Sequence, residues 1–191
     1  MILETDLLRA ALQVKADASE PREFLRCIHI NEKHIEATDG KALVRMEHGQ
    51  AVSVDILVNF TQKIPAEAEF SQFVLTEKPF VIHYNDAEEV IAYSYIELIN
   101  SKYPQFDNVI PDSVTDKMPL IQSKLLALPY LLFECGAIGI QVSSKNSAVQ
   151  FIFDAFTNYR YGNPLLIVMP TRSDYFTEAQ KIFDNCLSEV E

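Results

Sequence analysis

A recurring order of elements is the feature that most constrains this chain of 191 residues. Apolar residues spaced as on a helix begin near Thr5, and the same spacing returns at 55–64 and at 123–133. Each of these stretches is followed by three runs in which apolar and polar residues alternate, as in half-buried strands. The repetition predicts an α+β fold built from helix-plus-antiparallel-sheet half-units.

The first half-unit carries the clearest pattern. At about 100° per residue, Leu7, Leu8 and Ala11 fall on one side of the helix that begins near Thr5. Asp39-Gly40 is expected to form a tight reversal between two strands, since glycine adopts positive φ at little cost. The strands expected in this unit cover 24–30, 34–38 and 41–47.

The later units follow the same plan. Pro65 is expected to stop the helix over 55–64, because proline cannot continue one. The strands expected after the second and third helices cover 73–75, 80–84, 90–96, 139–143, 149–153 and 165–169. We therefore expect a complete two-unit domain over 1–112, a half domain over 113–172 and a C-terminal amphipathic helix over 173–191.

Composition and charge exclude several classes of protein. Apolar residues make up 48% of the chain, enough for a substantial core. No apolar stretch approaches the roughly 20 residues that span a bilayer, and the first residues are acidic, so we expect a cytoplasmic protein without membrane contact. The formal net charge of −11 argues against coating nucleic acid by bulk attraction, although basic residues can still be segregated on one surface.

Signals for catalysis or metal binding are weak. The four histidines lack the spacing of metal ligands, and the five glycines form no phosphate-binding loop. Cys27, Cys135 and Cys186 are widely separated and are interpreted as ordinary thiols. We expect no enzymatic activity, no metal site and no cofactor.

Three short segments, in this order, carry a resemblance to a known family. Residues 35–43 include a Thr-Asp-Gly turn, residues 103–111 include a Tyr-Pro-Gln-Phe link and an Ile-Pro exit, and residues 167–172 end in Met-Pro-Thr-Arg. Together with the repeated half-units, they resemble the bacterial DNA sliding clamp, the beta subunit of the replicative DNA polymerase. The likeness covers about residues 5–172 and corresponds to a shortened version, with the middle domain plus the second half of the last domain.

The resemblance implies a pocket that holds short peptide motifs of partner proteins, such as DNA polymerase or repair factors. Lys41-Ala42 stands where clamps often have a His-Arg pair. The alternative is that Leu43, Val168 and Met169 are simply core residues at strand ends. The residues implied for the pocket are Thr38, Gly40, Leu43, Pro111, Val168, Met169, Pro170 and Arg172.

The resemblance also implies contact with duplex DNA through basic residues on the helices, here Arg9, Lys15, Lys63 and Lys124. These could equally be solvated surface charges. Since a clamp ring needs a fixed number of half-units, a shortened chain would close only as a homo-oligomer of roughly four copies.

Two functions follow from the resemblance. The first is a sliding-clamp-like processivity factor in DNA replication or repair, which binds partners through the pocket and encircles DNA as an oligomer. The alternative is a non-encircling clamp-fold protein that acts as an adaptor, decoy or regulator of replication proteins. Because residues 180–183 resemble a clamp-binding motif, we also hypothesise that the C-terminal helix packs near the pocket, in the same chain or in a neighbouring subunit.

Overall fold

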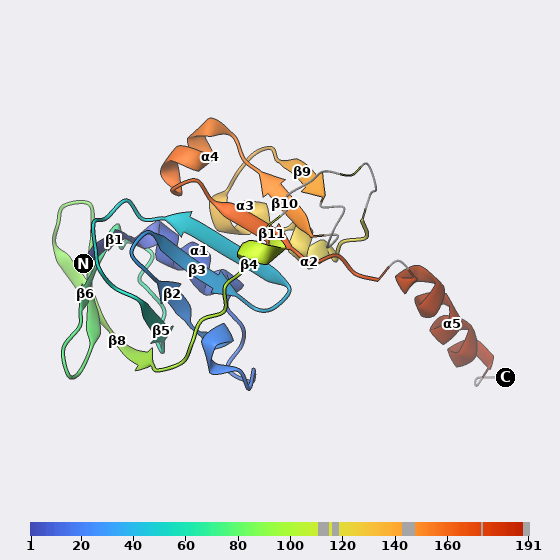
Figure 1. Ribbon diagram of the computed structural model, residues 1–191, viewed down its shortest axis with the longest axis horizontal. Helices are drawn as coiled ribbons and strands as arrows, with labels where there is room; N and C mark the ends of the chain where they lie inside the picture. Colours follow the sequence, from blue (N-terminus) through green and yellow to red (C-terminus); the bar gives the residue numbers. More distant parts are fainter. Residues whose placement is uncertain (111–114, 116–118, 143–147, 173, 189–191) are drawn as a thin grey trace.

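The computed structural model describes residues 1–110, 115, 119–142, 148–172 and 174–188. Its centre is one eleven-stranded sheet with the order β1-β6-β7-β8-β5-β2-β3-β4-β11-β10-β9, in which every described pairing is antiparallel. A few helices accompany this sheet (Figure 1). The expected α+β fold is confirmed.

The elements have the following bounds. The strands are β1 (Ile2–Glu4), β2 (Ile28–Ile30), β3 (His34–Thr38), β4 (Ala42–Glu47), β5 (Ile56–Phe60), β6 (Phe70–Val74), β7 (Phe80–Tyr84), β8 (Val90–Ile99), β9 (Gly139–Val142), β10 (Val149–Ile152) and β11 (Leu165–Val168). The helices are α1 (Thr5–Val14), α2 (Ser123–Leu126), α3 (Leu128–Phe133), α4 (Ala155–Arg160) and α5 (Tyr175–Ser188), with 3₁₀ turns η1 (Glu23–Arg26) and η2 (Asp107–Val109).

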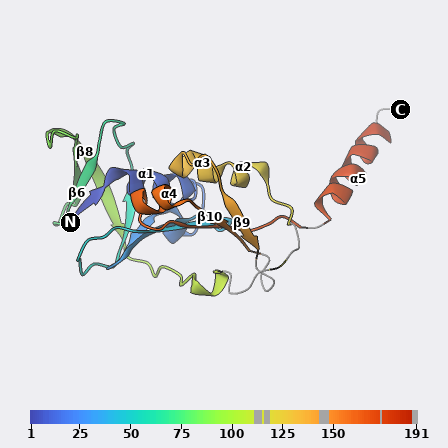
Figure 2. The same cartoon turned by 90° about the horizontal axis from the view of Figure 1, so that it is seen from above.

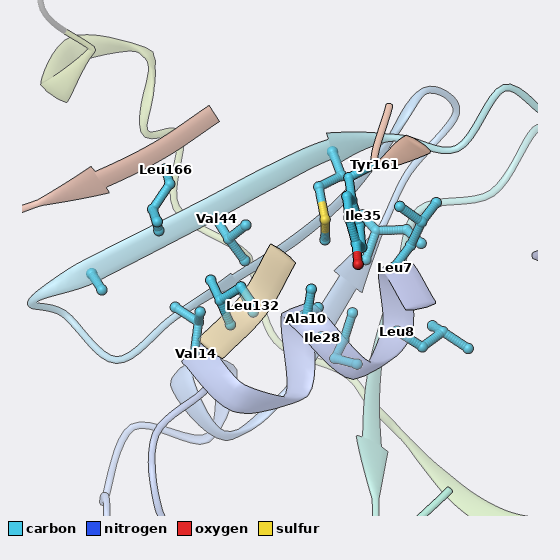
Figure 3. Packing of buried hydrophobic residues seen from close by; sticks show 14 of the residues in the cluster. Leu7, Leu8, Ala10, Val14, Ile28, Ile35, Val44, Leu132, Tyr161 and Leu166 are labelled. Atoms are coloured by element: carbon cyan, nitrogen blue, oxygen red, sulfur yellow. The ribbon is translucent and has the colours of Figure 1, made fainter. Parts of the chain in front are cut away.

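The main core lies between the helices and one face of the sheet. α1, α3 and α4 lie on this face, while the chain that follows β8 crosses the opposite face (Figure 2). Leu7 and Leu8 of α1 pack near Ile28, Ile35 and Val44 of the sheet (Figure 3). Each of these side chains is at most 2% exposed, and burying one such side chain stabilises the fold by about 1.5–3 kcal/mol.

The helix expected over 55–64 is wrong, because Ile56–Phe60 form β5, a strand between β2 and β8. Both faces of β5 are covered. Val58 and Phe60 belong to the main core, while Leu57 packs on the other face in a second cluster with Cys27 and Tyr103. A strand buried on both faces has apolar residues at consecutive positions, so its sequence imitates helical spacing.

Other expected bounds change locally. The strand expected over 24–30 is reduced to β2, because Glu23–Arg26 form the 3₁₀ turn η1. The helix expected over 123–133 is divided into α2 and α3, with Pro129 in the first turn of α3. α4 was not predicted; it is six residues long, and the Asp154 side chain caps it by accepting the N–H groups of Phe156 and Thr157.

The late strands extend the same sheet as the early ones. β11 pairs with β4, with Leu165 opposite Arg45 and Val168 opposite Ala42. The sheet is therefore continuous from the strands of residues 2–99 to those of residues 139–168. The division into a domain over 1–112 and a half domain over 113–172 stays a prediction.

α5 lies away from the sheet at one end of the molecule (Figures 1 and 2). Its side chains from Tyr175 to Asn185 are exposed, so the hypothesis that the C-terminal segment packs over the pocket of its own chain does not describe this structure. Among the described residues, no helix has both the length and the apolar character to cross a membrane.

Gly162 provides a test of how the late strands join β4. Its φ is +58°, its carbonyl accepts the Glu47 N–H at 2.7 Å, and an added Cβ would lie 1.8 Å from the Glu47 carbonyl oxygen. Gly49, with φ +67°, has no atom within 4 Å of the same position. We expect Gly49→Ala to cost about 1 kcal/mol from backbone strain alone, and Gly162→Ala about 1–3 kcal/mol more, measured by urea unfolding. Equal losses in the two variants would contradict this packing.

Candidate functional site

The turn between β3 and β4 is fixed by its own polar side chains. Gly40 has a φ of +85°, and the Asp39 carboxylate accepts the N–H groups of Lys41 and Ala42, each at 2.7 Å. The Thr38 hydroxyl donates to the Ala42 carbonyl at 2.6 Å and accepts the Gly40 N–H at 3.0 Å. These bonds hold the turn in one shape, and they occupy the Thr38 hydroxyl.

The end of β11 lies directly beside this turn. Ile167 is opposite Leu43 in the β4–β11 register, and the Met169 N–H donates to the Lys41 carbonyl at 2.8 Å. The structure thus brings together the Asp-Gly turn and the Met-Pro edge, although more than 120 residues separate them in the chain.

Strand alternation assigns the neighbouring side chains to two faces. Val168 is fully buried in the main core, so it supports this region from the helix side. Leu43 and Ile167 point to the other face because their neighbours along each strand belong to the main core. Leu43 is 4% exposed, whereas Met169, at 39%, is accessible to a ligand. We call the region of Thr38, Leu43, Ile167 and Met169 the junction face; Met169 is the exposed member, whereas Thr38 and Ile167, at 3% and 2% exposed, lie beneath the surface like Leu43.

The segment after β11 is held close to the sheet. Pro170 is half-buried, and the Thr171 N–H donates to the Leu120 carbonyl at 2.8 Å. The Arg172 guanidinium is exposed and pairs with Asp174 at 2.6 Å and Glu178 at 3.1 Å, at the start of α5. Pro111 lies outside the described residues.

The connector, defined here as residues 100–110, is attached to the same face of the sheet. Tyr103 stacks on His29 with ring centroids 4.3 Å apart, and Phe106 contacts Tyr103 edge-on at 5.4 Å. The Tyr103 hydroxyl is buried and has no hydrogen-bond partner within the described part of the chain. Tyr103 therefore anchors the connector through its ring.

A chain of charged groups joins the connector to β2, β3 and β4. His29 Nδ1 is 2.8 Å from Glu36 and Nε2 is 2.7 Å from Asp55, while Arg45 donates to Glu36 and, at 2.8 Å, to Asp107 of the connector. Glu36 is 3% exposed. Removing one partner of such a buried pair leaves an uncompensated charge and costs about 3–5 kcal/mol.

The environment favours the charged forms of both central groups. Burial opposes protonation of His29, but its hydrogen bonds to Glu36 and Asp55 outweigh that effect and raise its pKa. Burial also disfavours the Glu36 carboxylate, yet the hydrogen bond from His29 and the charge of Arg45 lower its pKa below the ordinary value. The sequence patterns did not predict this network, because it depends on the strand register that brings Glu36 opposite both His29 and Arg45.

The four basic residues expected to face DNA come from three separate segments. The Arg9 guanidinium donates to the carbonyls of Pro65, Ala66 and Ala68 at 2.6–2.8 Å and to Asp6 at 2.9 Å, so it fixes a loop against α1. Lys15 is half-buried at the end of α1, Lys124 is exposed on α2, and Lys63 is exposed in the loop after β5 rather than on a helix.

Histidine side chains are potential metal ligands. Across the described ranges, no group of three or more His, Cys, Asp or Glu side chains is placed to hold an ion. His83 is fully buried, 2.9 Å from each of the hydroxyls of Ser71 and Ser94. Its burial, together with the charge of Arg9, lowers the pKa of the imidazole, which suits a structural hydrogen-bonding role.

This sheet architecture is the DNA-clamp fold. The structure is similar to the DNA polymerase sliding clamp from Bacillus subtilis, with a TM-score of 0.62 and 12% identity over 91% of this chain and 64% of the clamp. It is also similar to the Helicobacter pylori beta clamp bound to a DNA ligase peptide, with a TM-score of 0.62 and 10% identity over 90% of this chain and 65% of the clamp. The Bartonella birtlesii clamp bound to griselimycin has a TM-score of 0.58 and 13% identity over 90% of this chain and 65% of the clamp.

No family model and no curated protein sequence matches the chain. The expected resemblance to bacterial sliding clamps is confirmed for the fold, and the chain spans about 65% of the length of those clamps.

Replacing His29 with Gln tests the charged network. Because the pKa of His29 is raised in the folded protein, its charged form contributes stability that is fully present below about pH 6.5 and is lost as pH rises through the folded-state pKa. The difference in unfolding free energy between the native protein and His29→Gln should therefore be larger at about pH 6 than at about pH 8.5.

His34→Gln is the matched control. Burial, followed by the charge of Arg45, lowers the pKa of His34, so its contribution should change with pH in the opposite direction. Urea unfolding at both pH values measures the two differences, and a His29 contribution that increases with pH would refute the assigned network.

Proposed function

We propose that this protein is a clamp-fold docking protein of DNA replication or repair, which binds short peptide segments of partner proteins at the junction face. The observation that carries the proposal is the position of Met169. Its backbone is bonded to Lys41 beside the Asp39-Gly40 turn, and its side chain is partly exposed on the connector side of the sheet.

The chemistry of this surface suits a peptide with an apolar anchor. A flexible thioether next to the half-buried Pro170 can adapt to an inserted apolar side chain. Interfaces of this kind derive most of their affinity from a few buried anchors. The exposed Lys41 borders this surface and is suited to polar or acidic groups that flank the anchor, while Arg172 is already paired with Asp174 and Glu178.

The clamp from Helicobacter pylori was solved with a DNA ligase peptide, which supports peptide docking as the role of the shared fold. We propose partners of the same type for this chain, namely polymerases or repair factors that carry a clamp-binding motif. In this proposal the protein acts as an adaptor or regulator through docking, without a catalytic step.

Encirclement of duplex DNA by an oligomer is the second candidate. It is favoured by the common position of α1 and α3 on one side of the sheet, where they contact each other and could line a hole. The engagement of Arg9 by Asp6 and three carbonyls weighs against it, because a guanidinium used inside the fold is not available to phosphates. Docking is therefore the function that we propose first.

Met169→Glu tests the docking proposal. A charge at the exposed edge should weaken binding of a fluorescently labelled peptide carrying a Gln and paired hydrophobic residues by at least about tenfold, or about 1.4 kcal/mol. Tyr159→Ala is the control, since Tyr159 is an exposed apolar side chain on α4, away from the junction face. Fluorescence anisotropy measures both. Absence of peptide binding to the native protein, or equal affinity in Met169→Glu, would reject the proposal.

A further inference from the structure

One face of the sheet near the N-terminus is rich in aromatic and aliphatic side chains, and no described helix covers it. In β6 and β7, Phe73 and Val81 point into the main core, so the alternate side chains point to the opposite face. Within the described residues no helix covers that face, since α1 lies on the core side (Figure 2). We call it the aromatic face. Glu4 and Gln72 also lie on it, and Gln72 accepts a hydrogen bond from the Tyr84 hydroxyl at 2.7 Å. Its large apolar members are Ile2, Phe70, Phe80, Ile82, Tyr84, Tyr93 and Tyr95.

The strand register gathers these side chains into one patch. Ile82 is opposite Tyr93, and Phe80 is opposite Tyr95 with its ring 6.2 Å from that of Tyr93. Tyr93 and Tyr95 are 59% and 67% exposed. A contiguous apolar patch of this kind on a soluble protein typically marks an interaction surface. Tyrosine suits such a surface because it offers a large apolar ring and a polar end.

α5 is the second uncovered apolar surface. At about 100° per residue, Phe176, Ala179 and Phe183 share one side of the helix, and Tyr175 and Ile182 border it. Phe176 and Phe183 are 68% and 58% exposed. A helix of 14 residues is only marginally stable in water without tertiary packing, so this apolar side requires a partner.

α5 cannot cover the aromatic face of its own chain. Met169 and Thr171 are bonded to Lys41 and Leu120, and the three residues between Thr171 and α5 span at most about 10 Å, so α5 laid along the sheet would end at most about 31 Å from Thr171. The aromatic face extends from β8, five strands from β11 or about 24 Å across the sheet, to β1, eight strands or about 38 Å away, so the helix would reach only its nearest strands. The two surfaces lie toward opposite ends of the molecule (Figure 1).

We propose that α5 of one copy packs its apolar side on the aromatic face of a second copy. The dimensions agree, because a helix of 14 residues is about 21 Å long and the four strands β1, β6, β7 and β8 together are about 19 Å wide. The contact joins two different surfaces at opposite ends of the chain. It is therefore head-to-tail, and it can repeat to form a closed ring or an open chain of copies.

The experiment uses two full-length variants. In the helix variant, Phe176→Asp and Phe183→Asp place charges on α5; in the sheet variant, Tyr93→Asp and Tyr95→Asp place charges on the aromatic face. All four side chains are exposed, so the changes spare the core. We expect the native protein to be oligomeric by multi-angle light scattering, and each variant alone to lose at least about tenfold in self-association.

Mixing the two variants gives the decisive result. The intact α5 of the sheet variant and the intact aromatic face of the helix variant can form one contact, so an equimolar mixture should yield a heterodimer that grows no further. Thr177→Asp, an exposed change on the polar side of α5, should leave the native oligomer unchanged.

Three results would overturn the proposal. A monomeric native protein would show that the two surfaces do not bind each other. An undiminished oligomer in the sheet variant would show that α5 pairs with another α5 or with a different surface. A mixture that remains monomeric would exclude the head-to-tail contact. Peptide binding at the junction face is measured separately and does not decide this outcome.

Discussion

The pairing of β11 with β4 is the interaction on which the rest of the structure depends. It makes one sheet from strands far apart in sequence and places α3 beside α1 over a common core. The register that puts Ile167 opposite Leu43 also brings Met169 to the Asp39-Gly40 turn. Because a slip of one residue would exchange the two faces of β11, burial of Leu166 and Val168 in the core specifies this register. The geometry of the junction face is thus a consequence of core packing.

The opposite face of the sheet is organised by electrostatics and aromatic stacking. Asp55, His29, Glu36, Arg45 and Asp107 form a continuous series of contacts from β5 to the connector. Such a series contributes little net stability relative to apolar packing. Its connector member, Asp107, has a side chain that is 71% exposed, so the path of the connector is fixed mainly by the burial of Tyr103 against His29, Cys27 and Leu57. The aromatic face and α5 differ from these packed regions, because their apolar surfaces lack partners within the described chain.

Sequence patterns predicted α1 and the β3–β4 hairpin. The α1 stripe follows from its periodicity, and the hairpin follows from its Asp-Gly turn, although β3 and β4 are buried on both faces. β5 was mistaken for a helix because Leu57 and Val58 are buried on opposite faces, a fact that depends on the connector. For the candidate site, the sequence alone identified separate short segments. Only the family resemblance indicated that these segments belong to one site. Ile167 and the His29–Glu36–Arg45 network require the strand register, which no local pattern contains.

The central claim is that the turn after β3 and the end of β11 form one docking surface. The most direct measurement is a titration of isotope-labelled protein with the peptide, followed by the backbone amide shifts of each residue. The account predicts that the backbone amides of residues 38–43 and 167–171 show the largest shifts. The shifts of both segments should have the same dependence on peptide concentration. Shifts confined to β6, β7 and β8, or binding that leaves both of these segments unchanged, would contradict it.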